Sequence, residues 1–242
     1  MLNSAALANR YHEVLARVRS AESSARRDAG STQLMVVTKG VAAEQIVAVV
    51  DAGATQFGEN RVQELEAKRA AVEALRPGVQ FTWVLIGPLQ SNKARRAIAV
   101  ADRIATVGDV ALLERIAAIA TESARPVQIA LQVNVDQDPA KSGFSSVELH
   151  AALPAIAAIV QHAPVTLSGL FTVGRLTVGG EASRPTFVAF RNLAAQVERD
   201  AVALDLTIGP LRSAGMSADF EVAIAEGSTE VRIGSALFGP RG

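Results

Sequence analysis

The chain of 242 residues contains no cysteine. This absence excludes disulfides, thiolate metal sites and cysteine nucleophiles, and it is typical of a protein from a reducing compartment. Only three histidines occur, His12, His150 and His162, and all lie in segments with helical patterning. Because they form no ligand cluster, we do not expect a zinc site.

Neither sign of charge is in excess, since 24 Lys+Arg face 24 Asp+Glu and the formal net charge is zero. A nucleic-acid partner is not expected, because phosphate binding needs a clustered basic excess. No apolar run approaches the roughly 18 residues of a membrane span. The first 21 residues mix charges with apolar residues, unlike a targeting signal. We therefore expect a soluble, cytoplasmic protein without a membrane partner.

Hydrophobic residues make up 49% of the chain, enough for a packed core. Short β-rich runs alternate with longer, Ala-rich helical runs. Strands are predicted at 33–39, 55–58, 80–86, 103–107, 127–135, 166–173, 206–211 and 230–237. Helices are predicted before the first strand and then at 42–52, 60–75, 89–100, 110–123, 147–161, 184–203 and 217–225.

This alternation predicts parallel βαβ units. The strand count and the length favour an α/β fold, a single (β/α)8 TIM barrel with an extra N-terminal helix. A doubly wound open sheet is the alternative, but no Gly-x-Gly-x-x-Gly follows the first strand. No linker-like stretch interrupts the chain, so residues 1–242 are expected to form one domain. Residues 174–184 are expected to form a long loop.

In such a barrel the chemistry lies at the C-terminal ends of the strands. Lys39 ends the first predicted strand. An amine in this position can attack a carbonyl and form a Schiff base. The alternative is that Lys39 is simply the first solvated residue after the strand. Asn60, after the second strand, could bond a ligand or cap the next helix.

The C-terminal part supplies small residues and a cation. Residues 213–217 lie between a predicted strand and a short helix, and Gly234-Ser235 lies within or just after the last strand. Loops in these places often form a phosphate site from backbone N–H groups, with serine hydroxyls as added donors. Ordinary turns, with Ser217 as a helix cap, are the alternative. Arg232 is either a fixed cation facing a ligand or part of a structural ion pair.

Several blocks, in order along the chain, resemble the pyridoxal phosphate homeostasis proteins, which are single-domain barrels that bind pyridoxal 5'-phosphate (PLP). FGENRVQE, IGPLQSNK and GSTxVRIG are together highly specific for this family. The barrel is also similar to the N-terminal domain of alanine racemase. The blocks are VTK at 37–39, FGENRVQE at 57–64, IGPLQSNK at 86–93, KSG at 141–143, GMS at 215–217, GST at 227–229, VRIG at 231–234 and FG at 238–239.

The resemblance implies that PLP is the cofactor, held as an internal aldimine on Lys39. Ser213, Gly234 and Ser235 would hold the phosphate, and Arg232 would face the pyridine nitrogen. Asn60 would lie near the cofactor. The implied role is intracellular PLP homeostasis or carriage by a monomer, with little or no catalysis and no metal, and with PLP-dependent apoenzymes as exchange partners.

The chain departs from the family pattern in a few places. Thr38-Lys39-Gly40 stands where the family usually has Ser-Lys-Thr, and Val84 stands where a His is common. Ser235 replaces a usual Thr and keeps the hydroxyl, while Arg212 replaces an apolar residue. None of these changes removes an implied cofactor contact, but Gly40 and Arg212 leave the loop shapes open. Lys93 and the loop 141–143 receive no role.

Two other functions stay open, a PLP-dependent amino-acid racemase-like enzyme and an aldolase-like barrel in which Lys39 acts on phosphorylated sugars. A cation at Arg232 would disfavour a protonated pyridine nitrogen and weaken the electron sink of PLP catalysis. A racemase also needs a second acid/base group. Alanine racemase takes it from a second domain, for which 242 residues leave no room, and Tyr11 is the only tyrosine. These arguments favour the carrier.

Overall fold

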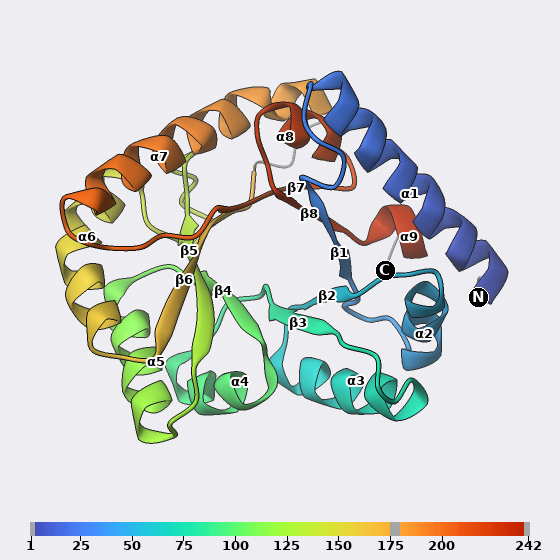
Figure 1. The fold of residues 1–242 in the computed structure, drawn as a ribbon, viewed down its shortest axis with the longest axis horizontal. Helices are drawn as coiled ribbons and strands as arrows, with labels where there is room; N and C mark the ends of the chain where they lie inside the picture. The colour runs from blue at the N-terminus through green and yellow to red at the C-terminus, as the bar shows by residue number, and fades with distance from the viewer. Residues whose placement is uncertain (1–2, 175–179, 240–242) are drawn as a thin grey trace.

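The computed structural model describes residues 3–174 and 180–239. Eight parallel strands form a closed barrel in chain order, surrounded by helices (Figure 1). β8 closes the barrel by pairing with β1, with Gln33 beside Glu230. The predicted TIM barrel is therefore confirmed, and the open-sheet alternative is wrong. The strands are β1 (Gln33–Val37), β2 (Gln56–Glu59), β3 (Thr82–Leu85), β4 (Arg103–Val107), β5 (Val127–Val133), β6 (Val165–Thr172), β7 (Leu211–Met216) and β8 (Glu230–Ile233).

The extra N-terminal helix is present and packs against α2, α8 and α9 on the outside of the barrel. No helix in the described part of the chain is long and apolar enough to cross a membrane. The helices are α1 (Ser4–Ser24), α2 (Ala43–Asp51), α3 (Val62–Leu75), η1 (Ser91–Lys93), α4 (Ala94–Val100), α5 (Val110–Glu122), α6 (Ser146–Gln161), η2 (Gly180–Ser183), α7 (Arg184–Val202), α8 (Phe220–Ala225) and α9 (Ser235–Phe238).

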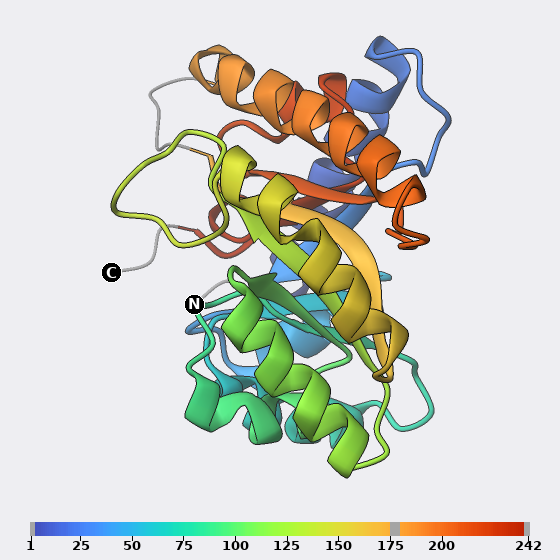
Figure 2. The same cartoon turned by 90° about the vertical axis from the view of Figure 1, so that its left-hand side faces the viewer.

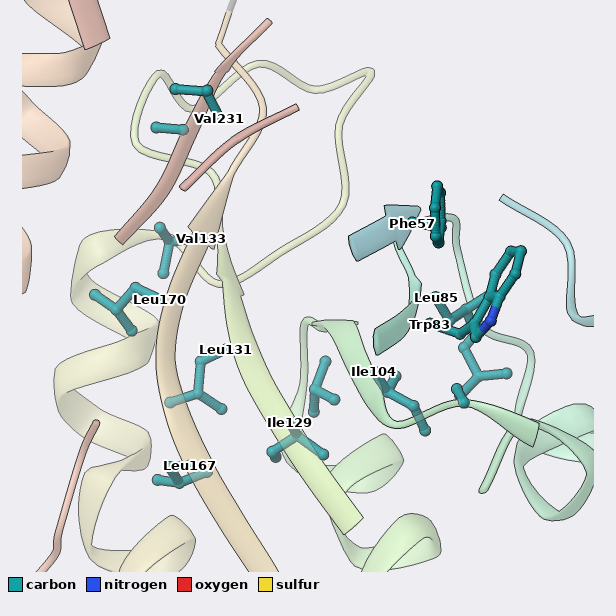
Figure 3. Packing of buried hydrophobic residues seen from close by; sticks show 14 of the residues in the cluster. Phe57, Trp83, Leu85, Ile104, Ile129, Leu131, Val133, Leu167, Leu170 and Val231 are labelled. Carbon is teal, nitrogen blue, oxygen red and sulfur yellow. The ribbon is translucent and has the colours of Figure 1, made fainter. Parts of the chain in front are cut away.

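Two apolar clusters follow from the alternation of side chains along the strands. The larger cluster joins the outer faces of the strands to the helices, and Phe57 and Trp83 lie together in it with ring centroids 5.0 Å apart (Figure 3). The smaller cluster fills the barrel interior with side chains from five strands, namely Met35, Val84, Ala105, Ala130 and Phe171. The interior is thus packed rather than a pore.

The N-terminal end of the barrel is closed by buried polar side chains. Gln56, Arg103 and Glu230 are the first residues of β2, β4 and β8. Gln56 Nε2 and Arg103 Nη2 both donate to Glu230 Oε2. Gln56 and Arg103 therefore share one oxygen of Glu230, while Arg103 Nε and Glu230 Oε1 are buried without a hydrogen-bond partner among the described residues.

The last two strands differ from their predicted bounds. β7 runs over Leu211–Met216, so the predicted strand at 206–211 is wrong. Pro210 has no N–H group to give to the sheet, and the strand begins only after it. β8 ends at Ile233, and the predicted end of the strand at 237 is helix α9. The short helix predicted at 217–225 begins later, as α8.

The end of the predicted loop 174–184 is helical in the structure. Gly180–Ser183 form η2, which leads directly into α7. Residues 175–179 lie outside the described residues. The connection from β5 to α6 is the loop that projects at the left of Figure 2.

Candidate functional site

A cavity of about 500 Å³ lies at the C-terminal ends of the strands. Its volume is within the range of small-molecule sites, about 300–1,000 Å³. It brings together Lys39, Asn60, Arg232, Gly234 and Ser235, five of the six predicted site residues. The lining consists of Val37, Lys39, Asn60, Ile86, Phe171, Val173, Met216, Ser217, Ala218, Arg232, Gly234 and Ser235.

Lys39 lies in a tight turn rather than at the end of the strand. β1 ends at Val37, and the N–H of Val41 donates to the carbonyl of Thr38 at 2.9 Å. Gly40 has φ +67°, which the third residue of a type II turn requires and which glycine adopts without strain. The departure from the family pattern at Gly40 therefore fits the turn. Lys39 itself is exposed at the edge of the cavity.

Arg232 in β8 is a fixed cation in the wall of the cavity. Its Nη1 donates to Ser213 Oγ at 2.8 Å, and its Nη2 donates to the carbonyl of Thr172 at 2.7 Å. The guanidinium carbon lies 4.2 Å from the centre of the Phe171 ring, a cation–π contact. Burial lowers the pKa of Arg232 to about 10, which leaves the group charged at neutral pH.

Ser217 is hydrogen-bonded to backbone amides at the start of α9, in the wall of the cavity that Arg232 also lines. The N–H groups of Gly234 and Ala236 donate to Ser217 Oγ at 3.4 and 3.3 Å. Both distances are at the long end for such bonds. The two amides converge on Ser217 Oγ, which lines the cavity, and anions are bound by similarly convergent backbone N–H groups.

Ser213 does not line this cavity. It lies within β7, is completely buried, and its hydroxyl accepts the hydrogen bond from Arg232. The family resemblance implied a phosphate contact for Ser213, and the seventh strand predicted at 206–211 placed this serine in the loop that follows, whereas it lies within β7. With β7 ending at Met216, Ser217 follows the strand and lines the cavity, as Ser235 also does. Pro210 was the signal in the sequence that could have shifted the strand.

Asn60 follows β2, is half-buried and lines the cavity. It does not cap α3, because the N-cap residue of that helix is Arg61. The backbone of Asn60 lies against Gly87, where a Cβ would come 2.1 Å from the Asn60 carbonyl oxygen. Gly87 of the IGPLQSNK block therefore allows the ends of β2 and β3 to approach each other closely.

A second cavity of about 330 Å³ adjoins the first and shares Ile86, Phe171 and Val173 with it. Lys141 lines this second cavity, and its Nζ lies 3.5 Å from Asp138 Oδ2. The loop 141–143 thus borders the mouth of the barrel. Lys93 lies at the end of η1, is exposed, and lines neither cavity.

Neither the single tyrosine of the chain nor a metal site adds to the mouth of the barrel in the described residues. Tyr11 is buried in α1, where burial raises its pKa, and it does not line the cavity. Among residues 3–174 and 180–239, no group of three or more His, Cys, Asp or Glu residues could hold a metal ion.

The fold and the site define a class of protein. The alanine racemase N-terminal domain family matches residues 12–242. Two alanine racemase structures share the fold; the one from Clostridium difficile has 14% identity and a TM-score of 0.73, covering 96% of this chain and 57% of that chain. The chain is thus a barrel of the alanine racemase N-terminal class.

More similar relatives define the family within that class. The pyridoxal phosphate homeostasis protein of Pseudomonas aeruginosa is 35% identical over 97% of this chain and 96% of its own length. The Escherichia coli protein of the same name is 32% identical over 97% of both chains. PipY of Synechococcus elongatus, solved with PLP bound, is 37% identical with a TM-score of 0.78, covering 92% of this chain and 100% of that chain. The chain belongs to the pyridoxal phosphate homeostasis protein family.

Proposed function

We propose that this chain binds PLP in the cavity at the C-terminal end of the barrel, with Lys39 as the covalent anchor, and that it serves intracellular PLP homeostasis or carriage. The observation that carries the proposal is the meeting of three kinds of group in one cavity. These are an amine on Lys39, a guanidinium on Arg232 and the small residues Ser217, Gly234 and Ser235, of which the serines carry hydroxyls.

The residues present fit this cofactor. The cavity wall has apolar side chains for an aromatic ring, including Val37, Ile86 and Phe171. Arg232 can donate to a ring nitrogen, and we assign the phosphate to Ser217, Gly234 and Ser235 together with the Ala236 amide. Ser213 then acts indirectly, because its hydroxyl holds Arg232. Asn60 is a further polar group in the cavity lining.

Bound PLP supplies an aldehyde for a lysine amine and a ring that can stabilise negative charge on an attached carbon. The condensation joins Lys39 Nζ to the aldehyde carbon and releases one water. The charge on Arg232 opposes a proton on the nearby ring nitrogen, which weakens the electron sink. Tyr11, the chain's single tyrosine, is buried in α1 and cannot act as a second acid/base at Lys39. We therefore propose little or no catalysis.

We further propose that residues 1–242 form one domain, that the protein is a cytoplasmic monomer and that it exchanges PLP with PLP-dependent apoenzymes. The exposed position of Lys39 supports exchange. Within residues 3–174 and 180–239, the large exposed apolar side chains are distributed over α3, α6, α7 and a loop and form no continuous seam, which supports a monomer. They are Leu75, Val79, Val147 and Val202.

The test is retention of PLP by the purified protein after desalting, read as the visible absorbance of the lysine adduct. We expect the wild type to keep the band and Lys39→Ala to lose it, while Lys93→Ala, a matched exposed lysine outside the cavity, behaves as the wild type. A band kept by Lys39→Ala would contradict the assignment. Rapid exchange of the α-proton of L-alanine in deuterated water would favour the racemase alternative, and retro-aldol turnover of a sugar phosphate without PLP would favour the aldolase.

A further inference from the structure

The turn that carries Lys39 is held from behind by side chains of β2 and α3. Lys68 Nζ, in α3, donates to the carbonyl of Thr38 at 2.7 Å and to Glu59 Oε1 at 2.6 Å. The Thr38 hydroxyl donates to the same Glu59 oxygen at 2.6 Å. None of these side chains lines the cavity. They contact the residue immediately before Lys39.

The residue after Lys39 is held by the same helix. The N–H of Gly40 lies 3.5 Å from Glu64 Oε2, and Lys68 Nζ donates to that oxygen at 3.3 Å. The three acceptors around Lys68, on Thr38, Glu59 and Glu64, match the three N–H donors of an ammonium group. We call Thr38, Glu59, Glu64 and Lys68 the turn clamp.

The burial of the clamp makes these contacts strong. The Glu59 side chain is 0% exposed and the Lys68 side chain 13% exposed. Hydrogen bonds between charged groups are about twice as strong as neutral ones, and exclusion of water increases the difference. The backbone on both sides of Lys39 is therefore tied to the rigid elements β2 and α3.

We propose that Lys68, with Glu59 and Glu64, is a positioning residue for the amine of Lys39. The clamp fixes the turn so that Lys39 Nζ is directed towards the cavity that Arg232 and Gly234 also line. This inference rests on the proposed function. It assigns to the FGENRVQE block a role in orienting the anchor, since Glu59 and Glu64 both belong to that block. Displacements of about 1 Å at a reacting group can change its reactivity by about a hundredfold.

The variant that tests this role is Glu59→Met combined with Lys68→Met. Replacing both partners of a buried ion pair by apolar residues of similar size leaves no buried charge alone and is often neutral for stability. Arg69→Met is the matched control. Arg69 is the next residue of α3 and also makes several hydrogen bonds, but to Val100, Asp102 and Glu73, away from Lys39.

The first measurement needs no PLP. Hydrogen exchange of the Val41 amide, which donates to the Thr38 carbonyl and closes the turn, reports whether the turn opens. We expect exchange about tenfold faster in the double variant and unchanged in Arg69→Met. The second measurement is the rate at which PLP leaves the loaded protein for an excess of a trapping apoenzyme, where we expect release about tenfold faster in the double variant only.

Three results would overturn the proposal: unchanged Val41 exchange, unchanged PLP release, or equal changes in both variants, which would indicate general softening of α3. Should the double variant not fold, Glu64→Gln, whose side chain is 34% exposed, replaces it with the same expected directions and a smaller effect. Unchanged exchange and release in Glu64→Gln would then be the contradicting result. A wild type that holds no PLP on Lys39 refutes the proposed function instead, and the Val41 measurement still decides whether the clamp holds the turn.

Discussion

The two ends of the barrel treat buried polar groups in opposite ways. At the N-terminal end, Arg103 is paired with Glu230, and Gln56 donates to the same carboxylate. At the C-terminal end, Arg232 is also buried, but its partners are the neutral oxygens of Ser213 and Thr172, and it lines a cavity. The charge of Arg103 thus has its counter-ion within the protein, whereas the charge of Arg232 faces a cavity that a ligand can enter.

The comparison also explains why the two arginines of the interior are not equivalent. Burial lowers the pKa of Arg232 to about 10, although the negative charges of Glu230 and Asp219 act against this effect. An anion or an acceptor atom in the cavity would stabilise the guanidinium that burial penalises. Binding of such a ligand would therefore stabilise the charged form of Arg232 at the C-terminal end.

The largest effect is expected at the N-terminal end. Arg103→Met leaves the Glu230 carboxylate buried without its partner, and we expect a loss of about 3–5 kcal/mol in the free energy of unfolding. Urea denaturation measures it. PLP retention should stay close to wild type at temperatures where the variant is folded. Adding Glu230→Met should restore most of the stability, and a variant that instead lost PLP while folded would contradict the separation of the two ends.

The next largest effect is expected for Ser217 at the C-terminal end of the barrel. Ser217→Ala removes a hydroxyl from the phosphate position, and we expect the dissociation constant for PLP to rise roughly tenfold to a hundredfold, as for a lost hydrogen bond to a charged group. Titration by absorbance measures it. Pyridoxal, which has no phosphate, serves as the control ligand and should bind equally to both proteins. A larger loss of pyridoxal than of PLP would contradict the assignment.

The Arg232→Leu variant tests the role of the buried cation at the C-terminal end. It removes the donor to the ring nitrogen but keeps Lys39, so we expect PLP to bind with a dissociation constant about tenfold higher and still to attach to Lys39. Ser213→Ala, which removes an acceptor of Arg232, should shift affinity in the same direction by less. An unchanged dissociation constant and an unchanged absorbance spectrum in Arg232→Leu would mean that its guanidinium does not contact the ring.

The smallest effect is a pH dependence away from the cavity, where α1 ends. Burial alone would raise the pKa of Glu22, but the Arg19 guanidinium and the amides of Gly30 and Thr32 outweigh it and lower the pKa. A lowered folded-state pKa gives stability that is present above the ordinary Glu range and is lost as the pH falls through the folded value.

Glu22→Gln should therefore lower the free energy of unfolding by about 1 kcal/mol at pH 7, the size of a single hydrogen bond. The difference from the wild type should shrink between pH 5 and pH 3, because the wild type alone loses this contribution there. Urea titrations at a series of pH values measure the two slopes. Parallel slopes for the two proteins would contradict the account, and PLP retention should not change.

The sequence predicted most of the barrel because its elements carry local signals. β4 lies at 103–107 as predicted, and the other early strands and helices shift by only a few residues. β7 was misplaced because Leu206–Leu211 has the apolar, β-branched pattern of a strand, although Pro210 and the bulge between Ser213 and Met216 move the real pairing towards the C-terminus. Because of that shift, Ser213 lies within β7 and not in the loop after it.

The rest of the site depends on contacts between distant segments. Lys39, Asn60, Arg232, Gly234 and Ser235 meet because the barrel brings together all strand ends, which the fold class predicts. Lys68 could not be predicted, since its role depends on reaching a carbonyl 30 residues earlier in the chain. Charged residues on a helix surface are ordinarily solvated, and only the packing of α3 against the β1 turn distinguishes this one.

The central claim is that Lys39 is the covalent anchor of PLP, and peptide mapping of the wild-type protein after borohydride reduction tests it most directly. The account predicts that the reduced adduct is found on Lys39 at close to one per chain. An adduct found mainly on Lys93, Lys141 or another lysine, or no adduct at all from protein saturated with PLP, would contradict it.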